Sequence, residues 1–172
     1  AMHMEFDEHR AYESAKEIVR VAIDNYANRQ GTVIPDVQEQ LIAGFSHEYV
    51  RYMQGGLYRG SFRPLNDAVA AGRIRGLAGV VGCNNARITH DSAITRIIDQ
   101  LIRNDVLVVV TGCAATGAAK HAYLRPEFME RAGAGLREVC EAIGIPPVLH
   151  VGSCVDNSRI LTILTQCATE GG

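Results

Sequence analysis

The feature that most constrains the fold of this chain is a pattern that occurs three times. Apolar runs at 77–81, 106–111 and 148–151 each end in a small residue followed by a cysteine: Cys83, Cys113 and Cys154. The cysteines are 30 and 41 residues apart, which leaves room for one helix and its loops between successive runs. A parallel strand pair needs such a crossover connection. The pattern therefore predicts successive strand–helix units and an α/β fold.

The segments between and after these runs carry helical patterns. A helix is predicted at 92–104, capped by Asp91 and packed on a sheet, because its apolar residues form one stripe. The Ala-rich segment 114–124 predicts a close-packed helix, and 126–144 predicts a single helix from Pro126 to Gly144. A final helix is expected after Cys154, capped by Asp156 or Asn157. The stripe of the first helix consists of Ile94, Ile97, Ile98, Leu101 and Ile102.

The first 72 residues show no strand pattern and are predicted to be mainly helical. A helix is expected over 7–29, with apolar residues on one face, and it ends near Gly31. Pro35 is expected to begin a short helix, Ser46 to cap another, and Pro64 to lie in the first turn of a third that Gly72 ends. The apolar face of the first helix consists of Ile18, Val19, Ala22, Ile23 and Tyr26.

These patterns divide the chain into three segments. Residues 1–4 resemble a cloning remnant, residues 5–72 form the mainly helical segment, and residues 73–172 form a Rossmann-like parallel sheet with flanking helices. The last helix is expected to end at Gly171-Gly172 with no further segment to cover the third strand. The sequence therefore reads as a piece of a longer protein.

Composition excludes several classes of function. A net charge of −2 gives no reason to expect nucleic acid or an anionic membrane as a partner. No apolar stretch approaches the roughly 18 residues that a transmembrane helix requires, and no secretory leader is evident. Five cysteines are an odd number without the dense spacing of a disulfide scaffold, which favours a reducing, cytoplasmic location.

The three cysteines after the apolar runs predict a metal centre. Ligands of parallel sheets bind beyond the carboxyl ends of the strands, where Cys83, Cys113 and Cys154 are expected to lie together. Adjacent helix N-termini are expected to lower the pKa of their thiols. Three thiolates suit an iron–sulfur cluster or a soft metal. His150 is a candidate donor of a hydrogen bond to a cluster sulfur, although a buried structural role is as plausible for it.

Other assignments follow from local context. Cys140 and Cys167 lie on helical patterns and are expected to be packing residues. The chain has no dinucleotide fingerprint, nucleophile elbow, phosphate-binding loop or Cys-x-x-Cys pair. A Cys–His nucleophile pair stays open, because a helix N-terminus can activate any of the three strand-end cysteines.

Three stretches together resemble the anaerobic nickel–iron–sulfur carbon monoxide dehydrogenases. They are "IRGLAGVVGCNNAR" with its later "HD", "VLVVVTGCAATGAAK" and "GIPPVLHVGSCVDNSRI"; "FDEHR" near the start is also similar. The match runs from about residue 62 to 169. The hybrid-cluster (prismane) proteins have a comparable cysteine layout, but the "VDNSR" ending favours the dehydrogenases.

The resemblance implies an activity and a ligand set. Members oxidise CO with water to CO2, two protons and two electrons at a nickel–iron–sulfur cluster. By motif position, Cys154 corresponds to a nickel ligand, and Cys83 and Cys113 correspond to iron ligands. The family also uses a histidine and cysteines from an upstream domain and a lysine from a downstream segment, which this chain lacks. His150 lies in a different motif from that histidine.

The resemblance also implies partners and limits. An electron acceptor such as a ferredoxin-like protein, the rest of the enzyme subunit and a second copy in a homodimer are the expected partners. The isolated chain is expected to be inactive and without an intact cluster. Three alternatives stay open: a hybrid-cluster protein that reduces hydroxylamine-like compounds, a metal-free α/β interaction domain, and apo thiols that capture zinc or oxidise.

Overall fold

A computed structural model describes residues 3–5 and 7–170 of the chain. Ala1 and Met2 of the expected cloning remnant, Phe6 of "FDEHR" and the closing Gly171-Gly172 lie outside the described residues. The chain divides into two compact units, Ala1–Gln38 and Glu39–Gly172. None of the described helices is both long enough and apolar enough to cross a membrane.

The first unit is built around α1 (Ala11–Asp24), with short 3-10 helices at Glu8–Arg10 and Tyr26–Asn28. The helical prediction for 7–29 is confirmed, although the segment is broken into three pieces. The short helix expected at Pro35 is wrong, because residues 29–46 contain no helix. Val33, Ile34 and Val37 are exposed, so no packing supports a short helix there.

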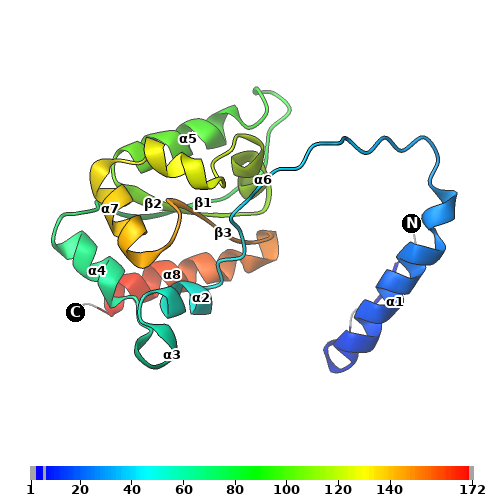
Figure 1. Ribbon diagram of the computed structural model, residues 1–172, viewed down its shortest axis with the longest axis horizontal. Helices are drawn as coiled ribbons and strands as arrows, with labels where there is room; N and C mark the ends of the chain where they lie inside the picture. Colours follow the sequence, from blue (N-terminus) through cyan, green and yellow to red (C-terminus); the bar gives the residue numbers. More distant parts are fainter. Residues whose placement is uncertain (1–2, 6, 171–172) are drawn as a thin grey trace. The chain divides into compact units, whose positions relative to one another are not determined.

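The second unit contains a parallel sheet of three strands in the order β1-β2-β3, shown in Figure 1. The strands are β1 (Gly76–Val80), β2 (Val106–Thr111) and β3 (Val148–Gly152). In the register, Val80 pairs with Val110 and Val108 pairs with Val148. The predicted α/β class and all three strands are confirmed, because buried β-branched residues favour strands that are covered on both faces.

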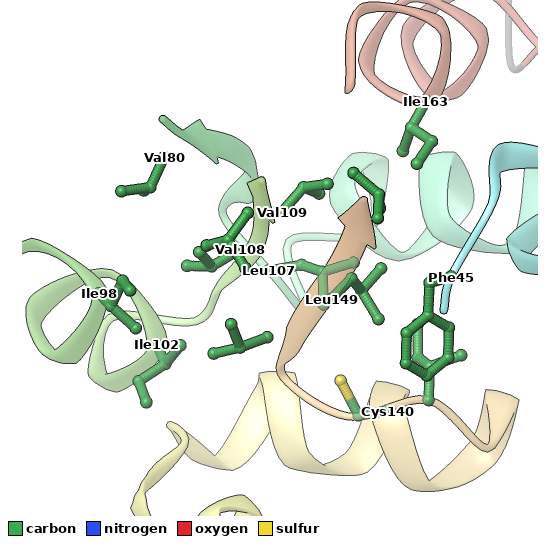
Figure 2. Packing of buried hydrophobic residues seen from close by; sticks show 14 of the residues in the cluster. Phe45, Val80, Ile98, Ile102, Leu107, Val108, Val109, Cys140, Leu149 and Ile163 are labelled. Carbon is green, nitrogen blue, oxygen red and sulfur yellow. The ribbon is translucent and has the colours of Figure 1, made fainter. Parts of the chain in front are cut away.

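Helices cover both faces of this sheet. α5 (Ser92–Arg103) and α7 (Ala134–Ile143) follow β1 and β2, and α8 (Asn157–Thr169) follows β3. Figure 2 shows Ile98 and Cys140 reaching the sheet from one side and Ile163 from the other. The predicted stripe of α5 is confirmed at three buried positions, whereas Ile97 is half exposed.

The helices before the sheet belong to the same compact unit. They are α2 (His47–Met53), α3 (Gly56–Arg59) and α4 (Arg63–Ala70). Ser46 caps α2 as predicted, since its hydroxyl accepts a hydrogen bond from Tyr49 N at 3.2 Å. α4 packs on α8, where Asn66 Nδ2 donates to the carbonyl of Cys167 at 2.8 Å.

Two predicted helices have different bounds. The helix expected over 126–144 is a 3-10 helix at Pro126–Arg131 followed by α7, with a break at Gly133. Gly133 N donates to the carbonyl of Ile102 at 2.9 Å, and a Cβ on Gly133 would lie 2.2 Å from Asp105 Oδ1. Close packing against the end of α5 thus overrides the helical pattern. α6 (Gly112–Lys120) ends earlier than predicted, because Ala122 adopts a left-handed φ of 67°.

Replacement of Ile98 tests the assignment of the buried face. Ile98 is 0% exposed and Ile97, its neighbour on the same helix, is 51% exposed. Ile98→Ala should lower the free energy of unfolding by about 2–5 kcal/mol, because it leaves a cavity against the sheet. Ile97→Ala should lower it by less than about 1 kcal/mol. Urea unfolding of both variants measures the difference, and equal losses would contradict the packing described.

Candidate metal centre

All three strand-end cysteines lie at one edge of the sheet. Because the strands are parallel and paired in order, their carboxyl ends meet at this edge. Cys83 follows β1 in a loop, Cys113 lies in the first turn of α6 directly after β2, and Cys154 begins a short 3-10 helix after β3. The three residues are exposed and their thiols are free.

The neighbours of these thiols show how closely the cysteines approach. The thiols of Cys83 and Cys113 lie near enough for the one to raise the pKa of the other. A Cβ on Gly112 would lie 2.4 Å from Cys154 Sγ, so that sulfur rests directly over the glycine that precedes Cys113. Gly112 also has a φ of +55°, which an L side chain rarely adopts. Glycine is therefore needed where the Cys154 sulfur packs on the residue before Cys113.

The expected lowering of the thiol pKa is wrong for Cys113. The interaction with the Cys83 thiol raises its pKa above the usual value, and desolvation and the carboxylate of Asp91 add to the effect. A hydrogen bond from the backbone acts in the opposite direction and does not compensate. The crowding of two sulfurs thus outweighs the helix terminus. A coordinated metal ion would reverse this balance, because it deprotonates the thiol that binds it.

The arrangement of the three thiols indicates which kind of metal group they could bind. Among residues 3–5 and 7–170, no three His, Cys, Asp or Glu side chains gather around a point where one ion could be held. A ready-made site for a single zinc ion is therefore lacking in that part of the chain. Three thiols spread along one edge suit a group of several metal atoms, each of which takes one thiolate.

Cys140 and Cys167 have the packing role predicted for them. Both are buried in the core. Burial raises the pKa of Cys140 to about 12 and that of Cys167 to about 11. Both side chains are therefore neutral thiols at physiological pH and act as small apolar groups.

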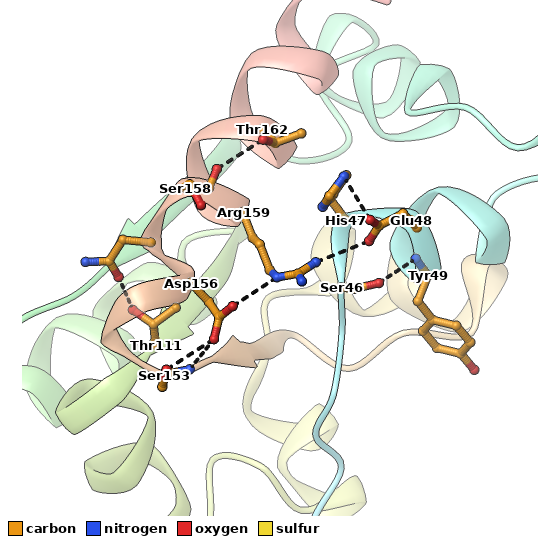
Figure 3. A network of polar contacts seen from close by, with 11 residues as sticks. Ser46, His47, Glu48, Tyr49, Thr111, Ser153, Asp156, Ser158, Arg159 and Thr162 are labelled. Atoms are coloured by element: carbon orange, nitrogen blue, oxygen red, sulfur yellow. Dashed lines mark hydrogen bonds and ion pairs between the residues drawn. The ribbon is translucent and has the colours of Figure 1, made fainter. Parts of the chain in front are cut away.

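The turn that carries Cys154 is held by a network of polar contacts, shown in Figure 3. Asp156 Oδ2 accepts hydrogen bonds from the backbone N of Ser153 at 2.9 Å and from its hydroxyl at 3.2 Å. Arg159 Nε donates to Asp156 Oδ1 at 3.1 Å, and its Nη1 lies 3.3 Å from Glu48 Oε2 on α2. The backbone of Ser153, followed by Arg159, lowers the pKa of Asp156.

The cap predicted for the last helix is thereby corrected. Asp156 occupies the N-cap position of α8, but its carboxylate makes no cap bond to that helix. It closes a capping box on the preceding 3-10 helix instead. The Asn157 side chain is engaged with the hydroxyl of Thr111 at 2.5 Å. The polar residues after Cys154 thus fix the turn on which the cysteine sits.

Asp91 has a role that its position before a helix does not indicate. It occupies the expected N-cap position of α5, but its side chain caps nothing. The residue is 3% exposed, and its carboxylate accepts a hydrogen bond from Asn84 Nδ2 at 2.7 Å and forms an ion pair with Lys120. His90 Nε2 and His121 Nε2 lie 3.5 and 3.8 Å from the same carboxylate. Lys120 and His121 come from a segment distant in sequence, so no local pattern indicated the ion pair.

His150 lies in β3 and is partly buried. Its carbonyl accepts hydrogen bonds from Gly44 N at 3.1 Å and from Phe45 N at 3.0 Å. Its Nδ1 atom is buried and has no hydrogen-bond partner within the described part of the chain. Contact with a cluster sulfur stays a prediction for this residue.

Comparison with known proteins gives consistent matches. The family model described as the Prismane/CO dehydrogenase family matches residues 1–172. Carbon monoxide dehydrogenase 1 of Methanosarcina mazei is 46% identical over 173 residues, which cover 99% of this chain and 27% of that protein. The chain therefore spans about a quarter of the length of this relative.

Solved structures agree with the sequence comparison. Carbon monoxide dehydrogenase IV from Carboxydothermus hydrogenoformans has a TM-score of 0.78 at 40% identity, covering 95% of this chain and 28% of that one. A structure described as showing NiZn[Fe4S4] and NiNi[Fe4S4] clusters in alpha subunits of acetyl-CoA synthase/carbon monoxide dehydrogenase has a TM-score of 0.79 at 34% identity. That match covers 99% of this chain and 27% of that one. With the family match over its whole length, the chain belongs to the Prismane/CO dehydrogenase family.

Proposed function

We propose that this chain provides the cysteine-bearing α/β region of a nickel–iron–sulfur carbon monoxide dehydrogenase. The observation that carries the proposal is the presence of three exposed, free thiols at the carboxyl edge of one parallel sheet. Relatives named carbon monoxide dehydrogenase and a similar structure with Ni- and Fe4S4-containing clusters in its description support it.

Each thiol has a proposed metal. Cys154 would bind nickel, and Cys83 and Cys113 would bind irons of the same cluster. Thiolates are the ligands that iron–sulfur clusters take. The approach of the Cys154 sulfur to Gly112, the residue before Cys113, supports the proposal of a shared cluster.

The metal group would supply the redox chemistry when bound: CO and water give CO2, two protons and two electrons. The residues of this chain have supporting tasks. The Ser153–Asp156–Arg159 contacts keep the Cys154 turn in one conformation. Gly112 leaves space for the Cys154 sulfur, which a side chain would displace. His150 is a proposed hydrogen-bond donor to a sulfur of the cluster.

The remaining requirements would be met by other parts of the enzyme subunit. These are a histidine, further cysteines and a lysine that handles protons. A ferredoxin-like protein is the proposed electron acceptor, and the enzyme would be a cytoplasmic homodimer. The isolated chain is proposed to be inactive and without an intact cluster.

Single cysteine substitutions in a full-length enzyme that contains this sequence test the ligand assignment. Cys154→Ser should lower the nickel content while most of the iron remains. Cys83→Ser and Cys113→Ser should lower the iron content. Each variant should lose CO-dependent viologen reduction by more than about 100-fold, because even the partners of metal ligands are worth 10–100-fold. Elemental analysis and the viologen assay measure both effects.

Cys140→Ala is the matched control for these variants. Cys140 is 1% exposed and lies in the core, so its replacement should lower stability and leave the metal content unchanged. Unchanged nickel and iron in all three strand-end variants would exclude the proposed ligand set.

The chain by itself offers a second test. Purified residues 1–172, treated anaerobically with iron, sulfide and nickel, should not reduce viologen with CO, because the other proposed ligands are missing. The same treatment of the full-length enzyme is the positive control. Turnover by the chain at a rate near that of the full-length enzyme would show that these residues suffice.

A further inference from the structure

The buried carboxylate of Asp91 stands between two of the proposed metal ligands. On one side, Asn84 Nδ2 donates to Asp91 Oδ1 at 2.7 Å, and Asp91 N donates to Asn84 Oδ1 at 2.6 Å. This reciprocal pair closes the loop from Asn84 to Asp91. Because Asn84 directly follows Cys83, the pair also fixes the backbone that carries this cysteine.

On its other side, the Asp91 carboxylate contacts the helix that carries Cys113. Lys120 in the last turn of α6 forms an ion pair with Asp91 Oδ2. A Cβ on Gly117, in the middle of α6, would lie 3.0 Å from Asp91 Oδ1. The carboxylate therefore rests against the backbone of α6 as well as on its lysine.

The backbone at Asp91 supports a specific role. Its φ of 60° is left-handed, a conformation that residues other than glycine adopt at a cost. The carboxylate is 97% buried from solvent by its partners, and a buried charge persists only where it is paired and hydrogen-bonded. A simple helix cap would need neither the strained backbone nor the ion pair.

We propose that Asp91 is a positioning residue for the metal cluster, an inference that rests on the function proposed above. Through Asn84 it holds Cys83, and through Lys120 it holds the helix of Cys113. The loop that carries Cys83 and the helix that carries Cys113 are thereby held together before any metal binds.

The rate of disulfide formation between Cys83 and Cys113 in the metal-free chain measures how closely their thiols are held. Diamide takes up two electrons and the two thiol protons to become a hydrazine, and one S–S bond forms. The assay uses the 172-residue chain with Cys154→Ser, so that Cys83 and Cys113 are its exposed thiols. Peptide mapping by mass spectrometry identifies the bond.

Asp91→Ala should slow this reaction by about tenfold or more, because the effective concentration of one thiol near the other falls. Asp91→Asn keeps a hydrogen-bonding oxygen for Asn84 but loses the ion pair, and Lys120→Met loses the same ion pair from its other end. Both should slow the reaction by a similar, smaller factor. The double variant should be no slower than either single one, because the same contact is lost.

These two variants separate positioning from a mere charge effect. Asp91→Asn removes a negative charge near Cys113, and Lys120→Met removes a positive one. An electrostatic effect on the thiols would change the two rates in opposite directions, whereas loss of positioning slows both. Opposite changes, or a wild-type rate in both variants, would overturn the proposal. Lys120 is half exposed, so this pair decides the question even where Asp91→Ala does not fold.

Asp99→Asn is the matched control. Asp99 lies on α5, the helix that follows Asp91. It pairs with Arg103 at 2.7 Å and with Arg131 at 3.0 Å, away from the cysteine loop. Its replacement should leave the rate unchanged. The assay contains no metal, so its result is independent of the proposed enzymatic function. The proposed function would be contradicted by a different result, namely a full-length enzyme that contains no nickel–iron–sulfur cluster.

Discussion

The register of three parallel strands is the constraint on which the site depends. Val80 pairs with Val110, and Val110 in turn pairs with His150. The next pair is Thr111 with Gly152, because β3 has an extra residue, Val151, at an irregularity in the ladder. A shift of one residue in either pair would turn every side chain to the other face of the sheet. It would also move a cysteine away from the shared edge. In the observed register the valines of β2 are buried, and both faces of this strand are covered.

The helices before the sheet extend this constraint to the helix that follows Cys154. α8 is tied to the segment 48–66 at several points along its length. Arg159 pairs with Glu48 near the start of α8, and the carbonyl of Cys167 accepts from Asn66 near its end. Glu170, after the helix, accepts a hydrogen bond from Phe62 N at 2.5 Å. The Cys154 turn is thus held by the sheet before it and by an anchored helix after it.

Periodicity predicted the parts of the fold that local physics decides. The three strands and the α5 stripe are clear, because continuous apolar runs and helical periodicity leave direct traces in the sequence. The shared edge of the cysteines follows from the same strands. The break at Gly133 was not predictable from pattern, because it results from contact with Asp105 and Ile102.

The roles of the two aspartates were hidden for a related reason. Asp91 and Asp156 both stand before helices, where a cap is the expected interpretation of an acidic residue. The Asp91 carboxylate pairs with Lys120, which only the fold brings near. The Asp156 carboxylate binds Ser153 and Arg159 within its own turn, so there one local interaction replaces another. A cap is a local interaction and can be predicted, whereas an ion pair between distant segments cannot.

Asp91 and Asp156 both lie near a strand-end cysteine, and both pair with a cation. A carboxylate beside a thiol opposes its ionisation, as Asp91 does for Cys113. Each aspartate, however, is paired with a cation: Asp91 with Lys120, and Asp156 with Arg159, which it shares with Glu48. A carboxylate that is paired with a cation produces a weaker field at a distance than an unpaired one. The turns that carry the cysteines can therefore be held by strong, charge-assisted contacts, while little net negative charge is added to an edge that already gathers three thiols.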